Sequence, residues 1–415
     1  MLLVGSGGRE HGLAWKLAQS PGLTTLYAAP GNPGIARHAE LMALDVADHA
    51  AVVAFCVERA IDLVVIGPEA PLVAGLADDL RAAGIAVFGP GRDGARLEGS
   101  KAFTKDLCAR AGIPTAAFVT AHDRATALAA LDRFGAPVVV KADGLAAGKG
   151  VTVAATRAEG QAAVDALFAV PGASAVIEEC LTGPEASLFV LTDGETMVPF
   201  GAAQDHKRVG DGDTGPNTGG MGAYSPAPVL TPELEARALA EIVAPTLDAL
   251  RADGIDYRGV LYAGLMLTLD GPKLIEYNAR FGDPECQVLM ARFDGDLLAL
   301  LHTVATATLA SARPVRFSGQ AALAVVLAAQ GYPVAPALGG LVAGIDAAEA
   351  TGAVVFQAGT RTDGGRLVAS GGRVLAVTAL GNTIADARAS AYRAVDVIDF
   401  PTGFCRRDIG ARAEP

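Results

Sequence analysis

The chain has 415 residues, of which 51% are hydrophobic and 19% are charged, and its net charge is −12. This acidic balance argues against sequence-blind nucleic-acid binding, which needs a basic face. The five cysteines are scattered without a C-x-x-C pair, so we expect neither a disulfide framework nor a zinc site. We find no secretory signal pattern and no apolar run near the roughly 18 residues that span a bilayer. We therefore expect a cytoplasmic α/β protein of two to four domains, with no membrane contact.

Residues 1–95 alternate short apolar runs with helical patterns. We expect strands in "LLV", "TTLYAAP", "IDLVVIG" and "IAVFG", and helices over 13–19 and up to Arg81. Strands and helices in series predict a parallel sheet with ligand loops at the carboxyl ends of the strands. A further helix is expected over 98–112, because Gly112 and Pro114 are stop signals.

The first loop, "GSGGREHG", is similar to a dinucleotide fingerprint but has Glu10 in place of its last glycine. No acidic residue follows at the end of the next strand, so a nicotinamide site is not expected. Two interpretations remain. The loop is either a tight turn into a helix or an anion site where backbone N–H groups and Arg9 meet at a helix N-terminus. We favour the anion site.

A second glycine-rich segment, "KADGLAAGKGVTV", lies between two expected strands. It is not a P-loop, because Gly150 stands where Ser or Thr is required and a strand follows instead of a helix. Its backbone N–H groups can still fold over phosphate oxygens, and Lys141 can reach the same anion. The alternative is a flexible hairpin with surface lysines. The glycines and Lys149 together favour phosphate.

The segment "VIEECLTGPEAS" has two expected strands around a short connection. This arrangement suits a purine wedged between sheets, with the backbone of Cys180 and Leu181 at the adenine edge. Glu178 could accept a hydrogen bond from the adenine amino group, and Glu185 could hold ribose hydroxyls. For each residue alone, an acid facing solvent beside a turn is the alternative.

A late strand ends in "IEYNARFGDPEC". Residues i and i+2 of a strand face the same way, so Glu276 and Asn278 present two oxygen atoms side by side. Mg²⁺ takes oxygen ligands and shares them with substrate phosphates. Arg280 can neutralise a transferring phosphoryl group, and Ile275 and Tyr277 are expected to point away. The alternative is a solvated strand edge.

The remaining patterns are weaker. Residues 205–225 have many glycines and few core-forming residues, which predicts a mobile surface loop. A helix is expected over 232–251, followed by two strands joined at Asp270 and Gly271. Residues 318–415 contain the expected strands "AALAVVLAA", "VVFQAG" and "RLVASGGRVLAVTALG", with a hairpin turn at Gly371 and Gly372. A helix over 382–397 and a basic tail, "FCRRDIG", follow.

The combination of a strand–glycine loop–strand unit, a Glu-bearing hinge and E-x-N-x-R resembles the ATP-grasp ligases. Longer motifs resemble the glycinamide ribonucleotide synthetase (phosphoribosylamine–glycine ligase) family: "GGREH", "GPEAPL", "LEGSKAFTKD", "VKADGLAAGKGV", residues 204–228, "RFGDPE" and "FCRRDIG". The resemblance implies a mixed α/β and α+β fold. It comprises an N-terminal parallel-sheet, Rossmann-like domain (1–97), an ATP-grasp core (98–317) with a mobile lid at about 114–190, and a small mixed C-terminal domain (318–415).

The resemblance also implies an activity. ATP phosphorylates the carboxylate of glycine, and the amine of 5-phosphoribosylamine attacks the acyl phosphate, giving glycinamide ribonucleotide, ADP and phosphate in de novo purine synthesis. Position by position, it implies that Arg280 and Lys207 are catalytic and that Glu276 and Asn278 hold Mg²⁺ or Mn²⁺. The implied ATP-binding residues are Lys101, Lys141, Gly144, Gly148, Lys149, Gly150, Glu178, Glu179, Cys180, Leu181 and Glu185. We expect a monomer.

The sugar-phosphate site is a hypothesis from location, because two polar loop regions could meet there. It comprises Gly7, Gly8, Arg9, Pro68, Glu69, Asp205, Asn217, Gly220 and Asp283. The chain departs from related grasp ligases at Gly264, where a further acid is often found, so we expect only two protein ligands for the metal.

Two alternative functions stay open. Another ATP-grasp carboxylate–amine ligase, or a carboxylase, would share the fold and the metal site. A non-catalytic nucleotide-binding module would explain the glycine loop, but it would not explain Glu276, Asn278 and Arg280 together.

Overall fold

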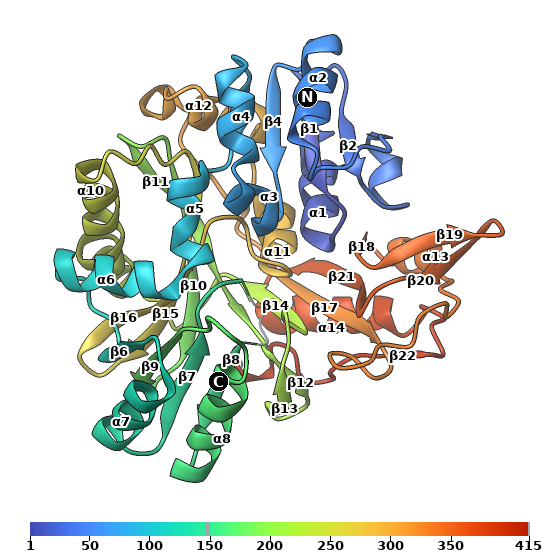
Figure 1. Cartoon of the computed structure of the whole chain (residues 1–415). Helices are drawn as coiled ribbons and strands as arrows, with labels where there is room; N and C mark the ends of the chain where they lie inside the picture. Colours follow the sequence, from blue (N-terminus) through green and yellow to red (C-terminus); the bar gives the residue numbers. More distant parts are fainter. Residues whose placement is uncertain (146–149, 414–415) are drawn as a thin grey trace.

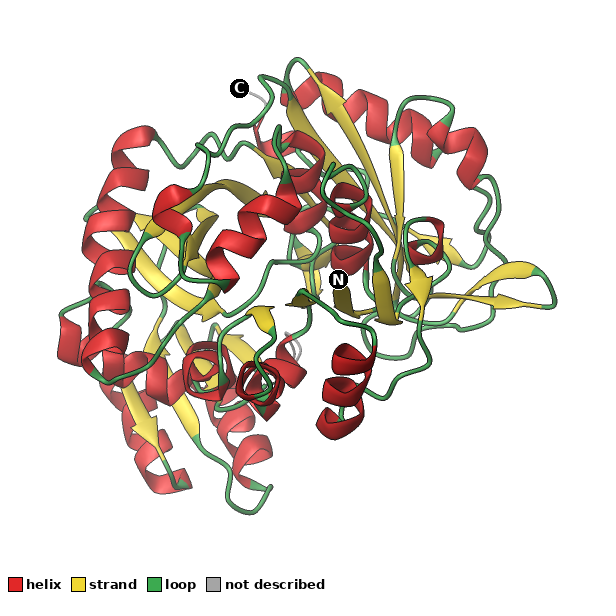
Figure 2. Ribbon diagram, turned by 90° about the horizontal axis from the view of Figure 1, so that it is seen from above, coloured by secondary structure: helices red, strands yellow, loops and turns green. Residues whose placement is uncertain are grey.

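The computed structural model describes residues 1–145 and 150–413. Within these residues the strands form five sheets, and Figure 1 shows the N-terminal part (blue), a small teal unit and the C-terminal part (red) around a central sheet. Figure 2 shows helices along the outside of the strands. No helix of the described chain is long and apolar enough to cross a membrane.

The N-terminal part is a parallel sheet, as predicted. Its order is β3-β2-β1-β4-β5, with strands Leu2–Gly5 (β1), Tyr27–Pro30 (β2), Glu40–Leu41 (β3), Leu63–Ile66 (β4) and Ala86–Phe88 (β5). The helices are α1 (Gly8–Leu17), α2 (His49–Glu58), α3 (Glu69–Ala74) and α4 (Leu76–Ala82), with a 3₁₀ turn at Ile35–Arg37. β1 and β4 are fully buried, as central strands of a sheet covered by helices on both faces are.

The first helix begins at Gly8, so the predicted start at Leu13 is wrong. The backbone N–H of Gly7 donates to Glu10 Oε2 at 2.7 Å. This capping contact starts the helix almost directly after β1. The glycine loop is therefore shorter than the sequence suggested, and the N-terminus of α1 lies close to the end of the strand.

The predicted helix over 98–112 is divided in two, α5 (Arg92–Gly99) and α6 (Lys101–Ala111). Ser100 has an extended backbone, and its hydroxyl accepts from the N–H of Phe103 at 3.2 Å, which makes it the N-cap of α6. Gly112 ends α6 at a φ of 66°, as the Gly-Pro signal predicted.

A four-stranded antiparallel unit, which we call the small sheet, has the order β6-β9-β7-β8. Its strands are Phe118–Ala121 (β6), Val138–Ala142 (β7), Val151–Ala154 (β8) and Ala175–Glu179 (β9), covered by α7 (Arg124–Phe134) and α8 (Arg157–Phe168). β7 and β8 pair on either side of the glycine-rich segment, as predicted. Gly148 and Lys149 lie outside the described residues.

The central sheet has nine strands in the order β16-β15-β10-β11-β14-β17-β21-β18, with β22 paired to β17. Its first strands are Glu185–Thr192 (β10), Met197–Asp205 (β11), Gly222–Ser225 (β14), Gly259–Thr268 (β15) and Gly271–Asn278 (β16). The helix predicted over 232–251 consists of α9 (Pro232–Ala238), one turn of π-helix (Leu239–Val243) and α10 (Ala244–Ala252). α11 (Glu285–Arg292), α12 (Leu297–Ala305) and a 3₁₀ turn (Leu309–Ser311) follow.

Residues 205–225 are not the mobile surface loop that their composition suggested. β12 (Arg208–Gly210) pairs with β13 (Thr214–Asn217), and β14 lies between β11 and β17. Every residue of β14 is buried. The glycines misled the prediction because Gly222 packs so closely on Ile409 that an added Cβ would lie 2.7 Å from it.

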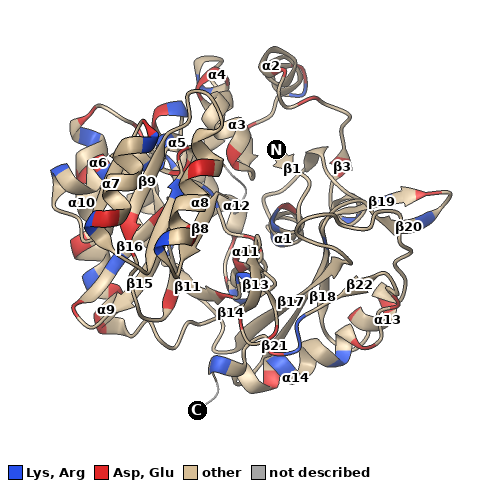
Figure 3. Ribbon diagram, turned by 60° about the horizontal axis from the view of Figure 1, so that its bottom comes forward, with Lys and Arg blue, Asp and Glu red and all other residues tan. Residues whose placement is uncertain are grey.

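The C-terminal part contributes β17 (Ala321–Ala329), β18 (Val354–Gln357), β21 (Arg373–Gly381) and β22 (Gly403–Phe404) to the central sheet. It also holds the hairpin β19 (Thr360–Asp363) and β20 (Arg366–Ala369), α13 (Ile345–Glu349), α14 (Ile384–Val395) and a 3₁₀ turn (Ala411–Ala413). Figure 3 shows positions of acidic and basic residues interspersed along helices such as α14.

The hairpin predicted at Gly371 and Gly372 is wrong. β20 pairs with β19 across Gly364 and Gly365, and β21 pairs with β17 and β18. The φ angles of Gly364 and Gly365 are 54° and 76°, as a tight two-residue hairpin turn requires.

Candidate active site

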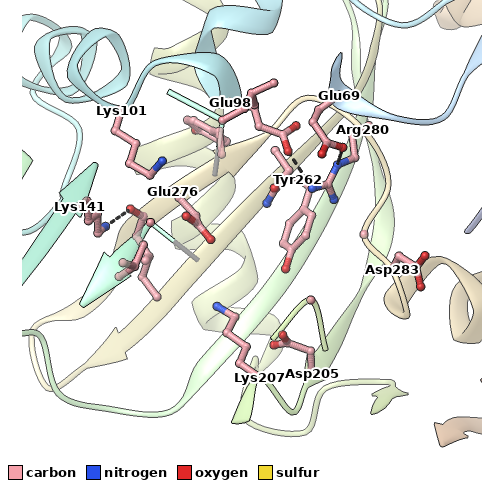
Figure 4. Close-up of a pocket in the computed structure, with 18 of the residues that line it drawn as sticks. Glu69, Glu98, Lys101, Lys141, Asp205, Lys207, Tyr262, Glu276, Arg280 and Asp283 are labelled. Carbon is pink, nitrogen blue, oxygen red and sulfur yellow. Dashed lines mark hydrogen bonds and ion pairs between the residues drawn. The ribbon is translucent and has the colours of Figure 1, made fainter. Parts of the chain in front are cut away.

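A cavity of about 440 Å³ lies where the small sheet, the central sheet and the N-terminal part meet (Figure 4). Lys101, Lys207 and Glu276 point toward the same space from different elements. The predicted site residues that line the cavity are Arg9, Glu69, Lys101, Lys141, Gly144, Gly150, Glu178, Asp205, Lys207, Glu276, Asn278, Arg280 and Asp283.

The other described candidates are not among the lining residues: Gly7, Gly8, Pro68, Glu179, Cys180, Leu181, Glu185, Asn217 and Gly220. Glu179 braces the edge of the small sheet, where its Oε1 accepts from the N–H of Ala117 at 2.9 Å. Gly8 packs against Gln287, and an added Cβ there would lie 2.6 Å from Nε2 of that side chain.

Glu276 and Asn278 face the cavity at the end of β16, while Tyr277 is buried and its hydroxyl lies 2.7 Å from the hydroxyl of Thr246. Ile275 is an extra, unpaired residue, because Gly264 pairs with Glu276 and the next residue, Leu265, pairs with Leu274. Ile275 lines the cavity, so the expectation that it points away is wrong; Tyr277 also contributes to the lining, although its hydroxyl is turned toward Thr246.

The carboxylate of Glu178 lies between two lysines. Its Oε2 is 3.1 Å from Nζ of Lys105 and its Oε1 is 2.9 Å from Nζ of Lys141. Lys141 also donates to the carbonyl of Ile275 at 3.1 Å, which links the small sheet to the central sheet. Glu178 Oε1 has the ion pair with Lys141 but no hydrogen bond of good geometry among the described residues, and a carboxylate oxygen can accept from a second donor, such as one on a ligand.

Lys101 begins α6 and reaches the glycine-rich segment, where Nζ donates to the carbonyl of Gly144 at 3.0 Å. Burial lowers the pKa of Lys101, and Glu276 opposes that shift. The ammonium group therefore stands in a partly desolvated position beside the Glu276 carboxylate, where an anion such as a phosphate would be held strongly.

Arg280 bridges two carboxylates, with Nη2 2.7 Å from Glu98 Oε1 and Nε 3.3 Å from Glu69 Oε2. Burial opposes the charged guanidinium, but Glu98 and Glu69 outweigh burial and raise its pKa. Within the described chain, the buried Nε donates no hydrogen bond of good geometry. Arg280 is therefore charged, fixed in place and still able to donate to a ligand oxygen.

Asp205 and Lys207 enter the cavity from the end of β11 and the residues after it. Lys207 Nζ lies 2.6 Å from Glu185 Oε2, so the carboxylate predicted to hold ribose hydroxyls pairs with a lysine here. Burial raises the pKa of Asp205 to about 7, and nearby Glu285 adds to the rise, against the opposing charge of Lys207. A carboxyl that titrates near neutrality suits proton transfer.

The start of α1 meets the residues just before α11. The backbone N–H of Arg9 donates to Asp283 Oδ2 at 3.3 Å, and its guanidinium donates to the carbonyl of Phe281 at 3.1 Å. Arg373, from β21, donates to the carbonyl of Asp283 and lies 3.5 Å from Asp283 Oδ2. The first and last parts of the chain therefore meet at one end of the cavity.

Sequence reasoning missed several lining residues, including Glu98, Lys105, Tyr262, Tyr332 and Arg373. Lys105 follows Lys101 by one helical turn, a spacing that could have indicated a shared face. Glu98 lay in a helix predicted without a break, and Arg373 lay in a hairpin predicted at the wrong turn. For Glu98 and Arg373, the wrong prediction of local structure meant that no role in the site was predicted.

The described residues contain no cluster of three or more His, Cys, Asp or Glu side chains able to hold a metal ion. Glu276 and Asn278 nevertheless offer adjacent carboxylate and amide oxygens to the cavity, the donor types that Mg²⁺ and Mn²⁺ accept. Gly264, which pairs with Glu276, brings no third ligand from β15. The residues fit a cation that takes its remaining ligands from substrate phosphates and water.

An antiparallel small sheet over a central sheet, with lysines from both around one cavity, defines an ATP-grasp enzyme, and this confirms the expected fold class. Family models for phosphoribosylglycinamide synthetase match nearly the whole chain. The N domain matches residues 1–98, the ATP-grasp (A) domain residues 99–286 and the C domain residues 322–412. The chain belongs to the phosphoribosylglycinamide synthetase family.

Individual relatives agree with this assignment. The chain is 61% identical over 417 residues to a phosphoribosylamine–glycine ligase of Mesorhizobium japonicum, covering 100% of this chain and 98% of that one. A crystal structure of phosphoribosylamine–glycine ligase from Thermotoga maritima has a TM-score of 0.87 at 33% identity, covering 98% and 99%. The biotin carboxylase domain of a Hydrogenobacter thermophilus 2-oxoglutarate carboxylase shares the fold alone, at 16% identity, 97% and 91% coverage and a TM-score of 0.70.

Proposed function

We propose that this chain joins glycine to 5-phosphoribosylamine at the expense of ATP, giving glycinamide ribonucleotide, ADP and phosphate through a glycyl phosphate. The observation that carries the proposal is the single cavity that brings Lys101, Lys141, Arg280 and the Glu276–Asn278 pair together. The named relatives support the choice of substrates. The expected ligase activity, in the pathway of purine synthesis, follows from the same family membership.

In this proposal the nucleotide lies between the small sheet and the central sheet. Glu178 Oε1, which is paired with the ammonium of Lys141 at 2.9 Å, also accepts from the adenine amino group. Lys101 and Lys141 neutralise phosphate oxygens beneath the glycine-rich segment. Cys180 and Leu181 connect the two sheets and offer their backbone groups to the adenine edge.

Glu276 and Asn278 would hold Mg²⁺ or Mn²⁺, which would neutralise the phosphates and help to align the glycine carboxylate with them. Arg280 lies two positions further on and keeps its Nε available for an oxygen of the transferring phosphoryl group. No protein base is required for that step, because phosphoryl transfer depends on positioning and on charge stabilisation.

The amine substrate occupies the other end of the cavity. Arg373 and Arg9 face its phosphate, and Asp283 fixes both arginines through the contacts described above. Asp205, once ionised, accepts the proton that the attacking amine releases, and Lys207 stabilises the oxygen that gains charge on the acyl carbon. This end of the cavity is therefore built from the N-terminal, central and C-terminal parts together.

The test is a coupled assay with purified protein. ADP and phosphate should appear only when ATP, Mg²⁺, glycine and 5-phosphoribosylamine are all present, and the product should have the mass of glycinamide ribonucleotide. Turnover that needs bicarbonate and not glycine would favour a carboxylase. Nucleotide binding without any turnover would favour a non-catalytic module.

Three further assignments belong to the same proposal. The domain limits are 1–97, 98–317 and 318–415, with residues 114–190 as a lid, supported by the separate apolar core of the small sheet. We expect a monomer. We also propose a cytoplasmic location, which the five free cysteines support.

A further inference from the structure

The β12–β13 hairpin carries part of the acceptor end of the cavity. It begins beside Lys207 and ends beside Thr218, and both the N–H and the hydroxyl of Thr218 donate to the carbonyl of Lys207, at 2.7 and 2.9 Å. Thr218 and Gly219 line the cavity. A two-stranded hairpin is marginally stable in water by itself, so this one needs support from outside.

The support comes from the C-terminal segment, about 200 residues further along the chain. Arg406 has only 1% of its side chain exposed. Its Nη1 donates to the carbonyl of Arg208 at 3.0 Å and to Asp213 Oδ1 at 2.8 Å, so it binds the first strand of the hairpin and its turn. Its Nε and Nη2 both bind Asp408 at 2.7 Å.

Two further contacts hold the turn of the hairpin. The N–H of Gly212 donates to Asp408 Oδ2 at 2.8 Å, and the N–H of Arg407 donates to Asp211 Oδ1 at 2.8 Å. The buried Arg406 guanidinium thus lies between two carboxylates nearer the surface, Asp213 and Asp408, whose side chains are 51% and 28% exposed. A bidentate arginine–carboxylate pair of this kind fixes orientation as well as distance.

The end of the same segment contacts the residues that face the amine substrate. The guanidinium of Arg412 donates to the carbonyl of Asp205, and the N–H of Gly410 donates to His206 Nε2 at 3.3 Å. Burial lowers the pKa of His206 to about 3, so its ring stays neutral and can accept this hydrogen bond. Asp205, His206 and the hairpin are therefore all held from one side.

The segment itself is fixed to α14. The hydroxyl of Tyr392 donates to the carbonyl of Arg406 at 2.9 Å and accepts from the N–H of Ile409 at 3.0 Å. Ile409 is fully buried against Gly222 of β14. Because Tyr392 and Gly222 hold the segment in place, the segment can in turn hold the hairpin in one position.

We propose that residues 406–412 form a positioning element that sets Asp205 and Lys207 for attack of the amine on the acyl phosphate. The expected effect on kcat rests on the proposed function. The expected effect on the order of the hairpin rests on the contacts alone. Arg406 and Arg412 are positioning residues, because they act through the backbone of 205–213 and do not line the cavity.

The test compares Arg406→Gln and Arg412→Gln with the control Arg407→Gln. Arg407 lies in the same segment, but its side chain pairs with Asp396 on the exposed surface at 2.7 Å, away from the hairpin. In the first two variants we expect amide hydrogen exchange of residues 208–217 to rise at least about tenfold. We expect kcat for ligation to fall about 10- to 100-fold, with KM for ATP within twofold of wild type.

The control variant should behave as wild type in both measurements. If Arg406→Gln does not fold, Arg412→Gln decides, since that side chain is 39% exposed. Unchanged exchange in the hairpin of Arg412→Gln would overturn the proposal, as would a KM for ATP that rises in parallel with the loss of kcat. A wild-type protein without ligase activity would contradict the proposed function. The hydrogen-exchange measurement would still test whether residues 406–412 hold the hairpin.

Discussion

Nζ of Lys141 lies 2.9 Å from Oε1 of Glu178, and both side chains are about 95% buried. Lys105 approaches the same carboxylate from α6, so one negative charge compensates two positive ones inside the protein. Glu178→Gln removes that compensation, and breaking a buried ion pair costs about 3–5 kcal/mol. We expect urea unfolding to show a loss of this size, together with a higher KM for ATP. Glu179→Gln, on the exposed side of the same strand, should change stability by less than about 1 kcal/mol.

The metal assignment predicts a specific defect in Glu276→Gln. The amide keeps the shape of the side chain but loses the charge that a divalent cation needs, so kcat should fall about 100-fold or more at fixed Mg²⁺. Raising the Mg²⁺ concentration should recover part of the activity. Asp270→Asn, in the turn before β16, is the matched control and should need no extra Mg²⁺. Full activity of Glu276→Gln at low Mg²⁺ would contradict the assignment.

The pKa of Asp205 predicts opposite effects on activity and stability. Folding raises this pKa from 3.8 to about 7. The stability linked to the protonated form is therefore complete below about pH 4 and lost as pH rises through about 7. Ligation by the wild type should increase over that upper range, as the carboxylate ionises.

Asp205→Asn should abolish the rise in ligation rate near pH 7 and lower kcat by about 100-fold. Its melting temperature relative to wild type should be higher at pH 8 than at pH 5, because the variant has no carboxylate to ionise. A pH–rate profile and thermal melts at the two pH values check both statements. A variant that keeps the rise in activity near pH 7 would exclude Asp205 as the titrating group.

Arg373 predicts a defect confined to the amine substrate. Its guanidinium meets Asp283 at the acceptor end of the cavity, so Arg373→Ala should raise KM for 5-phosphoribosylamine about tenfold or more. KM for ATP should stay within twofold, since Lys101 and Lys141 are untouched. Arg361→Ala, on the hairpin β19–β20, removes an exposed arginine of the same C-terminal part and serves as the control. Equal changes in both KM values would show that Arg373 does not act at the acceptor end alone.

Strong local patterns predicted much of the fold correctly. Leu2–Gly5 and Ala321–Ala329 are continuous apolar runs, and both are buried strands. The alternation that put Glu276 and Asn278 on one face held for those two residues. It did not hold for Ile275, because a bulge depends on the pairing with β15 and leaves no mark in the strand's own sequence.

The largest error has a physical cause. Residues 205–225 take their structure from partners far along the chain, such as β17 and Ile409. The hairpin error is different, because the turn at Gly364 and Gly365 is local and has a glycine pair of its own.

Arg373 and Glu98 also depend on distant residues, Asp283 and Arg280. Glu98 stands in the segment "LEGSKAFTKD", but the resemblance gave a role there to Lys101 alone. Local sequence predicts local structure, and these residues are defined by distant contacts.

The unpaired residue Ile275 interrupts the alternation of β16 between the core face and the cavity face. Before it, Leu274 faces the core, and after it Tyr277 does so too, because one unpaired residue shifts the alternation by a single step. Deleting Ile275 would remove the bulge and make the pairing of β16 with β15 regular. Leu274 and Tyr277 would then stand two positions apart and keep the core face, and Glu276 and Asn278 would keep the cavity face. The deletion would remove the carbonyl that accepts from Lys141 at 3.1 Å. The bulge therefore serves the contact between the small sheet and the central sheet, and it leaves unchanged which side chains face the cavity and which fill the core.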